Sequence, residues 1–284
     1  MVLKERQLKI SCRTCCTSYY YRQCRSGTDI RLIRAEALNG QLVLKIVEFD
    51  LKGIVIIAGN YGSGKTEVAV NLAMNRKRAG MDVRIADLDL VNPYFRTREA
   101  RGVLTQLGID VVLPHEKYLN ADLPMLVPEI SGLIRQPGEL ALLDLGGDDV
   151  GATVLASLAD AFKDRQVHML QVVNPFRPFT DSIEGCLKIR AEIEKASRLT
   201  VSGIIGNANL IDETTVDDIY KGYDFVTSLS ERSGLPLKFI TAAVELLPVI
   251  DTKLFSCLVL PIHRQLVPPW KKPARVGTEH LILH

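Results

Sequence analysis

Short apolar runs alternate with longer stretches of helical periodicity from residue 53 to residue 260. The apolar runs are continuous rather than interrupted at every second position, which is typical of strands covered on both faces of a sheet. The intervening stretches repeat their apolar residues with a period near 3.6, which predicts helices. The expected strands are 53–58, 82–87, 110–113, 139–145, 167–173, 200–206, 238–242 and 255–260. The expected helices are 65–79, 97–107, 122–135, 150–162, 180–196 and 215–233.

This alternation predicts an α/β fold, doubly wound, with a mostly parallel sheet of about seven or eight strands and helices on both faces. We expect one domain over residues 41–262, followed by an irregular tail over 263–284. The composition, 47% hydrophobic and 24% charged over 284 residues, excludes disordered, collagenous and disulfide-scaffold classes. The apolar runs are far shorter than the roughly 20 residues of a membrane span. We therefore expect a soluble, cytoplasmic protein.

Residues 1–40 do not follow the strand–helix pattern. They hold eight Lys/Arg against three acids, a net charge of +5, so the total of +2 leaves −3 over residues 41–284. A body without excess positive charge argues against nucleic acid as a partner. One interpretation of the stretch is a disordered leader or a misplaced start, and a mitochondrial presequence is another. A third is a thiolate metal or iron–sulfur site built from Cys12, Cys15, Cys16 and Cys24.

One glycine-rich segment matches the phosphate-binding pattern G-x-x-x-x-G-K-[ST]. Its residues are Gly59, Asn60, Tyr61, Gly62, Ser63, Gly64, Lys65 and Thr66. The glycines allow successive backbone N–H groups to point at one centre, and the helix that follows adds its positive end. Lys65 is expected to reach the β- and γ-phosphates, and the Thr66 hydroxyl is expected to bind Mg²⁺. The segment follows an expected strand and opens an expected helix, so it predicts a nucleotide site.

Acidic residues stand at the ends of two further expected strands. Asp144 ends the strand 139–145 and Gly147 follows it, so we expect the carboxylate near Mg²⁺ and the Gly147 N–H near the γ-phosphate. Asp87 and Asp89 end the strand that follows the first helix. Parallel sheets bind ligands at this edge, where an Asp can orient or deprotonate water or hold Mg²⁺ through its waters.

The phosphate loop, the Asp-Leu-Asp-Leu-Val-Asn-Pro segment at 87–93 and the Asp-Leu-Gly-Gly segment at 144–147 resemble the MinD/ParA/CobQ-CobB group of P-loop ATPases, within the SIMIBI class. The resemblance covers about residues 50–262. It implies Mg·ATP binding and slow hydrolysis, coupled to docking of a protein partner or to a nucleotide-dependent homodimer. It assigns Asp89 as the catalytic, water-orienting acid beside Lys65, Asp87 and Asp144 to the Mg²⁺ shell, and Asn207 to the adenine.

The sequence departs from that group at two positions. The signature lysine, second in the loop, is Asn60 here, so the charge that this lysine brings to a partner's phosphates is missing. Glu67 replaces the second hydroxyl residue, which leaves the α-phosphate to backbone donors. Three arginines, Arg96, Arg98 and Arg101, can replace the missing charge or form a solvated, partner-facing helix start. The segment 174–178 can belong to the nucleotide pocket, to a partner loop or to an ordinary turn.

The expected function is that of a slow Mg·ATPase whose nucleotide state, detected by residues 87–101 and 146–150, controls docking to a partner. One alternative is an ATP-dependent ligase or kinase of the CobQ/CobB/dethiobiotin-synthetase type. Another is a non-hydrolysing, nucleotide-gated factor for assembly or metallocentre maturation. The sequence contains no Asn-Lys-x-Asp motif for reading guanine, which favours ATP.

Overall fold

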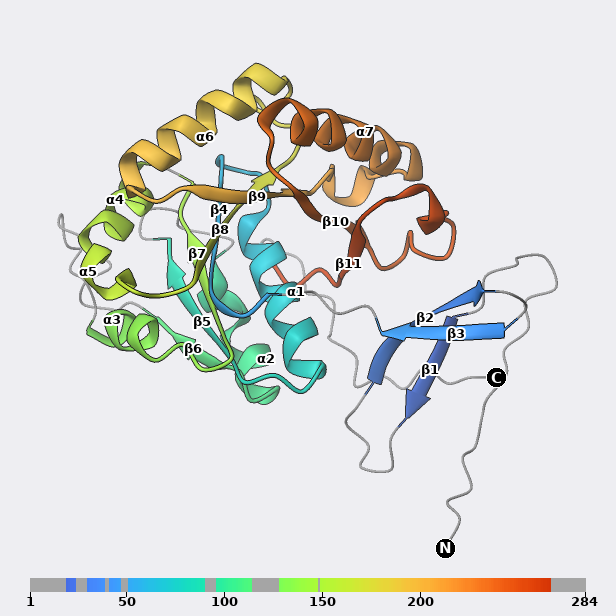
Figure 1. Cartoon of the computed structure of the whole chain (residues 1–284), viewed down its shortest axis with the longest axis horizontal. Helices are drawn as coiled ribbons and strands as arrows, with labels where there is room; N and C mark the ends of the chain where they lie inside the picture. The colour runs from blue at the N-terminus through green and yellow to red at the C-terminus, as the bar shows by residue number, and fades with distance from the viewer. Residues whose placement is uncertain are drawn as a thin grey trace, which may run out of the picture.

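The large sheet of the computed structural model is parallel throughout and has eight strands (Figure 1). The structure describes residues 19–23, 30–38, 41–46, 51–89, 96–113, 128–147 and 149–266. The strands are β4 (Gly53–Gly59), β5 (Val83–Leu88), β6 (Asp110–Val112), β7 (Leu140–Leu145), β8 (Val167–Val173), β9 (Val201–Gly206), β10 (Leu237–Ala243) and β11 (Leu258–Ile262). The doubly wound α/β fold predicted from the apolar pattern is confirmed.

The helices fall where the 3.6-residue period predicts them. They are α1 (Lys65–Arg78), η1 (Thr97–Ala100), α2 (Arg101–Gln106), α3 (Pro128–Arg135), α4 (Asp149–Ser157), α5 (Ala159–Phe162), α6 (Ile183–Ser197) and α7 (Val216–Ser233). The stretch expected as one helix over 150–162 is two helices, which meet at Leu158. The part of the expected helix 122–135 that precedes Pro128 lies outside the described residues.

The strand expected at 255–260 begins later, at Leu258. Asp251 caps the short 3-10 helix η4 (Thr252–Leu254) by accepting a hydrogen bond from the Lys253 N–H. The Tyr223 hydroxyl accepts a hydrogen bond from the Ser256 N–H at 2.9 Å. These contacts hold the apolar residues near 255 in a turn against α7, so their β-like composition does not extend the strand.

Successive residues of each central strand are buried on opposite faces of the sheet. In β4, Val55 and Ile57 join the apolar cluster beneath α1 and α2, whereas Ile54 and Ile56 join the cluster beneath α3, α4 and α5. A third cluster packs α6 and α7 against β9 and β10. The continuous apolar runs of the sequence are therefore a consequence of helices on both sides.

The strand order β11-β10-β9-β8-β4-β7-β5-β6 places β4 between β7 and β8. The chain continues outward through β5 and β6 on one side of β4 and through β9, β10 and β11 on the other. Such a switch point opens a crevice at the carboxyl ends of the strands, where α/β sheets bind ligands. The loop that follows β4 begins at this crevice.

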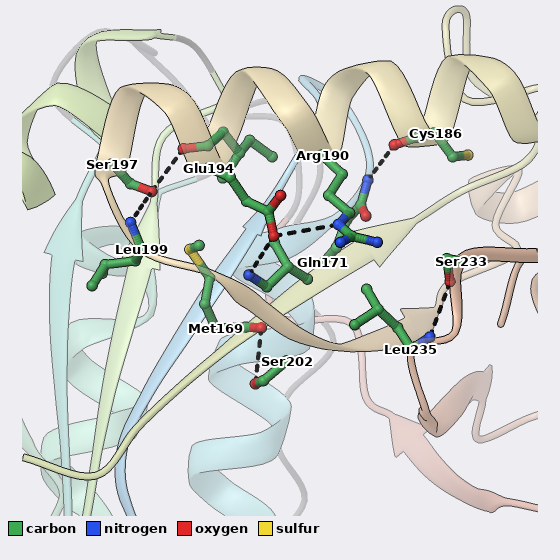
Figure 2. Close-up of polar contacts among 12 residues, drawn as sticks. Met169, Gln171, Cys186, Arg190, Glu194, Ser197, Leu199, Ser202, Ser233 and Leu235 are labelled. Atoms are coloured by element: carbon green, nitrogen blue, oxygen red, sulfur yellow. Dashed lines mark hydrogen bonds and ion pairs between the residues drawn. The ribbon is translucent and has the colours of Figure 1, made fainter.

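Polar contacts attach α6 to strands β8 and β9 (Figure 2). The Gln171 amide, on β8, donates to the Cys186 carbonyl at 3.0 Å. The Glu194 carboxylate accepts hydrogen bonds from Arg190 Nε at 3.3 Å and from the Val201 N–H, at the start of β9, at 2.8 Å. The Gln171 bond holds β8, from whose carboxyl end the next loop leaves at the ligand edge, and the Glu194 carboxylate holds the start of β9.

A separate antiparallel sheet consists of β1 (Tyr19–Gln23), β2 (Ile30–Leu38) and β3 (Gln41–Ile46), in the order β1-β2-β3. The first two strands fall within residues 1–40, where the sequence pattern predicts none. The segment of β2 has charged residues at both odd and even positions, so the alternation that predicts a strand is missing. The leader interpretation stays a prediction, and Cys12, Cys15, Cys16 and Cys24 lie outside the described residues. Among the described helices, none combines the length and the apolar composition needed to cross a membrane.

Candidate phosphate-binding site

The loop between β4 and α1 curls so that α1 begins at its end. Gly64, the N-cap of α1, has φ 87°, in the left-handed region that favours glycine. A Cβ at Gly64 would lie 2.3 Å from Asn207 Nδ2, so no larger residue fits. The Ser63 N–H donates to the Asn60 carbonyl at 3.2 Å and closes the turn. The unsatisfied N–H groups at the start of α1 therefore open toward the loop, the arrangement that binds phosphate.

Lys65 and Thr66, the predicted phosphate and metal residues, are both buried at the base of this loop. Lys65 Nζ donates to the Asn60 carbonyl at 3.0 Å. A Cβ at Gly147 would lie 2.9 Å from Lys65 Nζ and 2.7 Å from the Tyr61 Cα. The loop after β7 thus touches the phosphate loop, and the predicted residues Lys65, Tyr61 and Gly147 come together.

Asp144 and Asp87 are register partners on the neighbouring strands β7 and β5, and neither side chain is exposed. Asp144 Oδ2 accepts a hydrogen bond from Thr97 Oγ1 at 2.8 Å, whereas Oδ1 has no hydrogen-bond partner among the described residues. Burial and the charge of Asp87 raise the pKa of Asp144 to about 7, against the lowering effect of Thr97, Thr66 and Lys65. The positive charge of Lys65 therefore does not offset the effect of burial on this carboxyl group.

Asp87, in contrast, is fully engaged within the protein. Its Oδ2 accepts from Arg98 Nε at 2.8 Å, and its Oδ1 accepts from the Asp89 N–H at 3.0 Å. Burial raises the pKa of Asp87, and the Arg98 guanidinium opposes that rise. Arg98 also donates to the Asp89 carbonyl at 3.0 Å. In this structure Arg98 therefore stabilises the end of β5. Arg101 is exposed.

Asn207, expected at the adenine, has both of its polar groups engaged inside the protein. Its Nδ2 donates to the Ser63 carbonyl at 2.7 Å, and its Oδ1 accepts from Thr241 Oγ1 at 2.5 Å. Only 3% of the residue is exposed. In this structure Asn207 stabilises the phosphate loop by hydrogen bonding. An asparagine at a strand end can have this role or contact a base, and its position in the sequence does not tell the two apart.

Glu67, which replaces the usual hydroxyl residue, turns away from the loop. Its carboxylate accepts from the N–H groups of Gln265 at 2.7 Å and Leu266 at 3.0 Å. Burial raises the pKa of Glu67, and these N–H groups oppose the rise. Asn71, one turn along α1, accepts from the His263 N–H at 2.8 Å. We call this set of Glu67, Asn71 and residues 263–266 the tail clasp, and it engages both oxygens of the Glu67 carboxylate.

Asn60, at the position of the missing lysine, ties the phosphate loop to the segment after β8. Its Nδ2 donates to the Pro178 carbonyl at 2.9 Å. The segment 174–178 was open to several interpretations, and the structure places it beside the phosphate loop. Asn174 anchors it, since the Asn174 side chain accepts from the Phe176 N–H at 3.1 Å and the Asn174 carbonyl accepts from Thr180 Oγ1 at 2.7 Å.

Buried polar atoms without partners concentrate around this loop. In the described part of the chain, five buried side-chain atoms lack a hydrogen bond, and the fifth, Thr227 Oγ1, is on α7. The other four are Ser63 Oγ, Arg96 Nε, Asp144 Oδ1 and Arg177 Nε. Arg96 interacts electrostatically with Asp87 and Asp89, and Arg177 Cδ would lie 3.9 Å from a Cβ at Gly62. Because such atoms are costly to bury, their concentration here indicates a site shaped for a polar ligand.

The residues also fit a magnesium ion. Mg²⁺ takes oxygen ligands, usually from one or two carboxylates together with phosphates and water. Asp144 Oδ1 is an unpartnered buried oxygen, and the Thr66 hydroxyl interacts with the same carboxylate. No group of three or more His, Cys, Asp or Glu in the described ranges can hold a metal alone. The donor set therefore suits a cation that is shared with bound phosphates.

Comparison with known proteins gives structural neighbours only. No family model matches the chain, and no curated protein matches it. The solved structure of the cell division protein FtsY from Thermotoga maritima is 17% identical over 69% of this chain and 65% of its own, with a TM-score of 0.48. The signal recognition particle 54 kDa protein from Aeropyrum pernix in complex with GDP is 19% identical over 68% of this chain and 42% of its own, with a TM-score of 0.46.

A nucleotide-binding protein from Archaeoglobus fulgidus in complex with ADP is 20% identical over 69% of this chain and 84% of its own, with a TM-score of 0.42. The chain covers less than two thirds of the FtsY structures, 62% for Mycoplasma mycoides and 65% for Thermotoga maritima. These TM-scores are all below 0.5, so the doubly wound α/β fold rests on the strand order of this chain itself.

Proposed function

We propose that this protein binds Mg·ATP at the loop 59–66 and hydrolyses it slowly. One observation carries the proposal: among the described residues, three of the five unpartnered buried side-chain atoms, on Ser63, Asp144 and Arg177, lie in or against this loop. A fourth, Arg96 Nε, belongs to a side chain that interacts with Asp87 and Asp89. These four atoms comprise a hydroxyl, a carboxylate oxygen and two guanidinium nitrogens, which are the groups that a metal–triphosphate would satisfy. A glycine-rich loop at the start of a helix supplies the backbone donors for the phosphates.

Each predicted residue has a role in this proposal. Lys65 contacts the β- and γ-phosphates, and the Gly147 N–H approaches the outer phosphate. Thr66 and Asp144 hold Mg²⁺, which neutralises phosphate charge when it is bound. Asp89 orients the water whose oxygen bonds to the γ-phosphorus as the bond to the β–γ bridging oxygen breaks, giving ADP and phosphate. Asp87 with Arg98, and Asn207, position the backbone around these groups.

The nucleotide state is proposed to control docking of a partner or a second copy of the chain. Tyr61 and Phe179 are large apolar residues that are 67% and 72% exposed. They directly follow Asn60 and Pro178, which are joined by the hydrogen bond between the phosphate loop and the segment after β8. A change in phosphate occupancy therefore acts beside two exposed aromatic side chains, the residue type that interfaces favour.

Phosphate release from Mg·ATP by the parent and by Lys65→Ala tests the proposal. We expect slow phosphate release from the parent and none from the variant. Equal dye binding by the two proteins is the control that both are folded. Binding of Mg·ATP without release supports the nucleotide-gated alternative. Analysis of the label from γ-phosphate-labelled ATP, with and without cell extract, identifies a kinase or ligase by transfer to an acceptor. Absence of ATP binding by the parent contradicts the proposal.

A further inference from the structure

The phosphate loop has one fewer cation than its resemblance to the MinD/ParA group implies, because position 60 is an asparagine. The Asn60 amide is engaged with the Pro178 carbonyl at 2.9 Å. Arg98 forms an ion pair with Asp87 at 2.8 Å. Lys65 is thus the cation of the loop itself. A nucleoside triphosphate carries several negative charges, so a second cation at the outer phosphate would favour its binding.

Arg177 lies against this loop through its side chain. Its Cδ would be 3.9 Å from a Cβ at Gly62, so the side chain passes over the middle of the phosphate loop. Arg177 Nε is buried and has no hydrogen-bond partner among the described residues. Burying a guanidinium nitrogen without a partner is costly, and an anion at this place would remove the cost.

The backbone that carries Arg177 is held firmly. The Arg177 N–H donates to the Asn174 carbonyl at 3.2 Å, and the Arg177 carbonyl accepts from the Thr180 N–H at 3.2 Å. Asn174 itself is 1% exposed, and its Nδ2 donates to the Asn209 carbonyl at 2.8 Å. The segment is therefore a fixed support that holds the Arg177 side chain against the phosphate loop.

The neighbouring contacts indicate which phosphate Arg177 faces. Lysine of this motif reaches the β- and γ-phosphates, and Lys65 Nζ lies 3.0 Å from the Asn60 carbonyl. The Asn60 side chain in turn contacts the residue that follows Arg177. Arg177 is therefore next to the outer end of the phosphate site rather than to the inner end at Gly64 and Thr66.

We propose that Arg177 contacts the outermost phosphate of the bound nucleotide and supplies, from within the same chain, the positive charge that position 60 lacks. The planar guanidinium donates two parallel hydrogen bonds to phosphate oxygens, and Arg177 therefore distinguishes a triphosphate from a diphosphate. This inference rests on the proposed function, because it needs a nucleotide in the loop.

The test measures the dissociation constants of Mg·ATP and Mg·ADP for the parent, Arg177→Ala, Arg177→Lys and a control, Arg232→Ala, on the exposed end of α7. We expect Arg177→Ala to bind ATP about tenfold more weakly and ADP within twofold of the parent, on the scale of one charge-assisted hydrogen bond. Arg177→Lys should recover part of the ATP affinity, and the control should bind both nucleotides as the parent does. Circular dichroism and thermal unfolding check that each variant is folded.

Two outcomes overturn the inference while the proposed function stands. In the first, Arg177→Ala binds ATP as tightly as the parent does. In the second, Arg177→Ala weakens ATP and ADP equally, which places the residue away from the outermost phosphate. Lys65→Ala distinguishes failure of this inference from failure of the proposed function. If Lys65→Ala loses both nucleotides and Arg177→Ala does not, the loop binds phosphate whatever the role of Arg177. If the parent binds neither nucleotide, the proposed function fails, and this inference fails with it.

Discussion

The buried polar residues on the two sides of the phosphate loop differ in how completely they are hydrogen-bonded. On the β5–β7 side, the carboxylates of Asp87 and Asp144 are fully buried next to each other, and Asp144 keeps an unpartnered oxygen. On the β8–β9 side, the amides of Asn174 and Asn207 are equally buried, yet each has protein partners for its nitrogen and its oxygen. Both sides present polar strand ends to the same crevice.

The difference separates residues that await a ligand from residues that build the support. A buried amide with both groups hydrogen-bonded contributes to stability, whereas a buried carboxylate with a free oxygen costs stability until a cation binds. We therefore expect substitution of Asp144, the acid with the unpartnered oxygen, to remove function and to leave the fold intact. Substitutions on the amide side should do the reverse. The predictions below test this division.

The largest effect is expected at Asp144. Asp144→Asn removes the proposed metal contact, so Mg·ATP turnover should fall by about 100-fold or more, the scale of losing one strong electrostatic contact. The free energy of unfolding at pH 7.5 should stay equal to that of the parent or rise, because a buried charge has been removed. Turnover assays and urea unfolding measure the two quantities. A variant that is clearly less stable than the parent would place Asp144 among the supporting residues.

Next in size is the loss of stability at Asn207. Asn207→Ala leaves the Ser63 carbonyl and the Thr241 hydroxyl buried without partners, which should lower the free energy of unfolding by about 2–3 kcal/mol. Urea denaturation measures this loss, with Thr241→Ser as a control that keeps the hydroxyl. A loss below about 0.5 kcal/mol, within the range of ordinary surface substitutions, would contradict the bracing role.

A smaller effect is expected in the pH dependence of unfolding. The pKa of Asp144 is about 7 in the folded state, against 3.8 as its ordinary value. Between these values the folded state holds a proton that the unfolded state has released, so the free energy of unfolding falls as pH rises. From pH 5 to pH 7 the parent should lose about 2 kcal/mol more than Asp144→Asn does. Urea unfolding at several pH values checks this, and parallel curves for the two proteins would contradict it.

The smallest effect is expected at the tail clasp, which contains an acid that is satisfied by the protein. Glu67→Gln places an amide nitrogen against one of the N–H groups of Gln265 and Leu266, so about 1 kcal/mol of stability should be lost. Hydrogen exchange at those two backbone amides should become faster, while exchange in β4 stays slow. Unchanged exchange at residue 265 and residue 266 would show that the carboxylate is not what holds the segment.

The sequence predicts the framework of the site well because that framework depends on local patterns. The strand over 167–173 has the predicted bounds, and the phosphate loop lies between β4 and α1 as its glycines require. The choice of partner by each side chain is not local. Glu67 accepts from a backbone N–H 198 residues away, and Asn207 donates to the Ser63 carbonyl, 144 residues away. Asp87 and Asp144 look alike at strand ends, and their partners distinguish them: Arg98 pairs with Asp87, whereas Thr97 donates to Asp144.

The sequence did not single out Thr97, and for the segment 174–178, which contains Arg177, it left three roles open. The roles of both residues come from what they face. Thr97 donates to Asp144, and Arg177 lies over Gly62. A sequence motif is defined by residue types and their spacing along the chain. These contacts depend instead on which loops the strand order brings together.

The central position of β4 has a consequence for how the protein is made. This strand leaves the ribosome before both of its neighbours, since β4 pairs with β7 and β8 and neither exists when residues 53–66 emerge. A topology with such distant pairings folds slowly and exposes apolar strands in the meantime. The tail clasp closes last, when residue 266 has been added. A nascent chain that stops before β8 therefore carries the complete phosphate-loop sequence and no phosphate site.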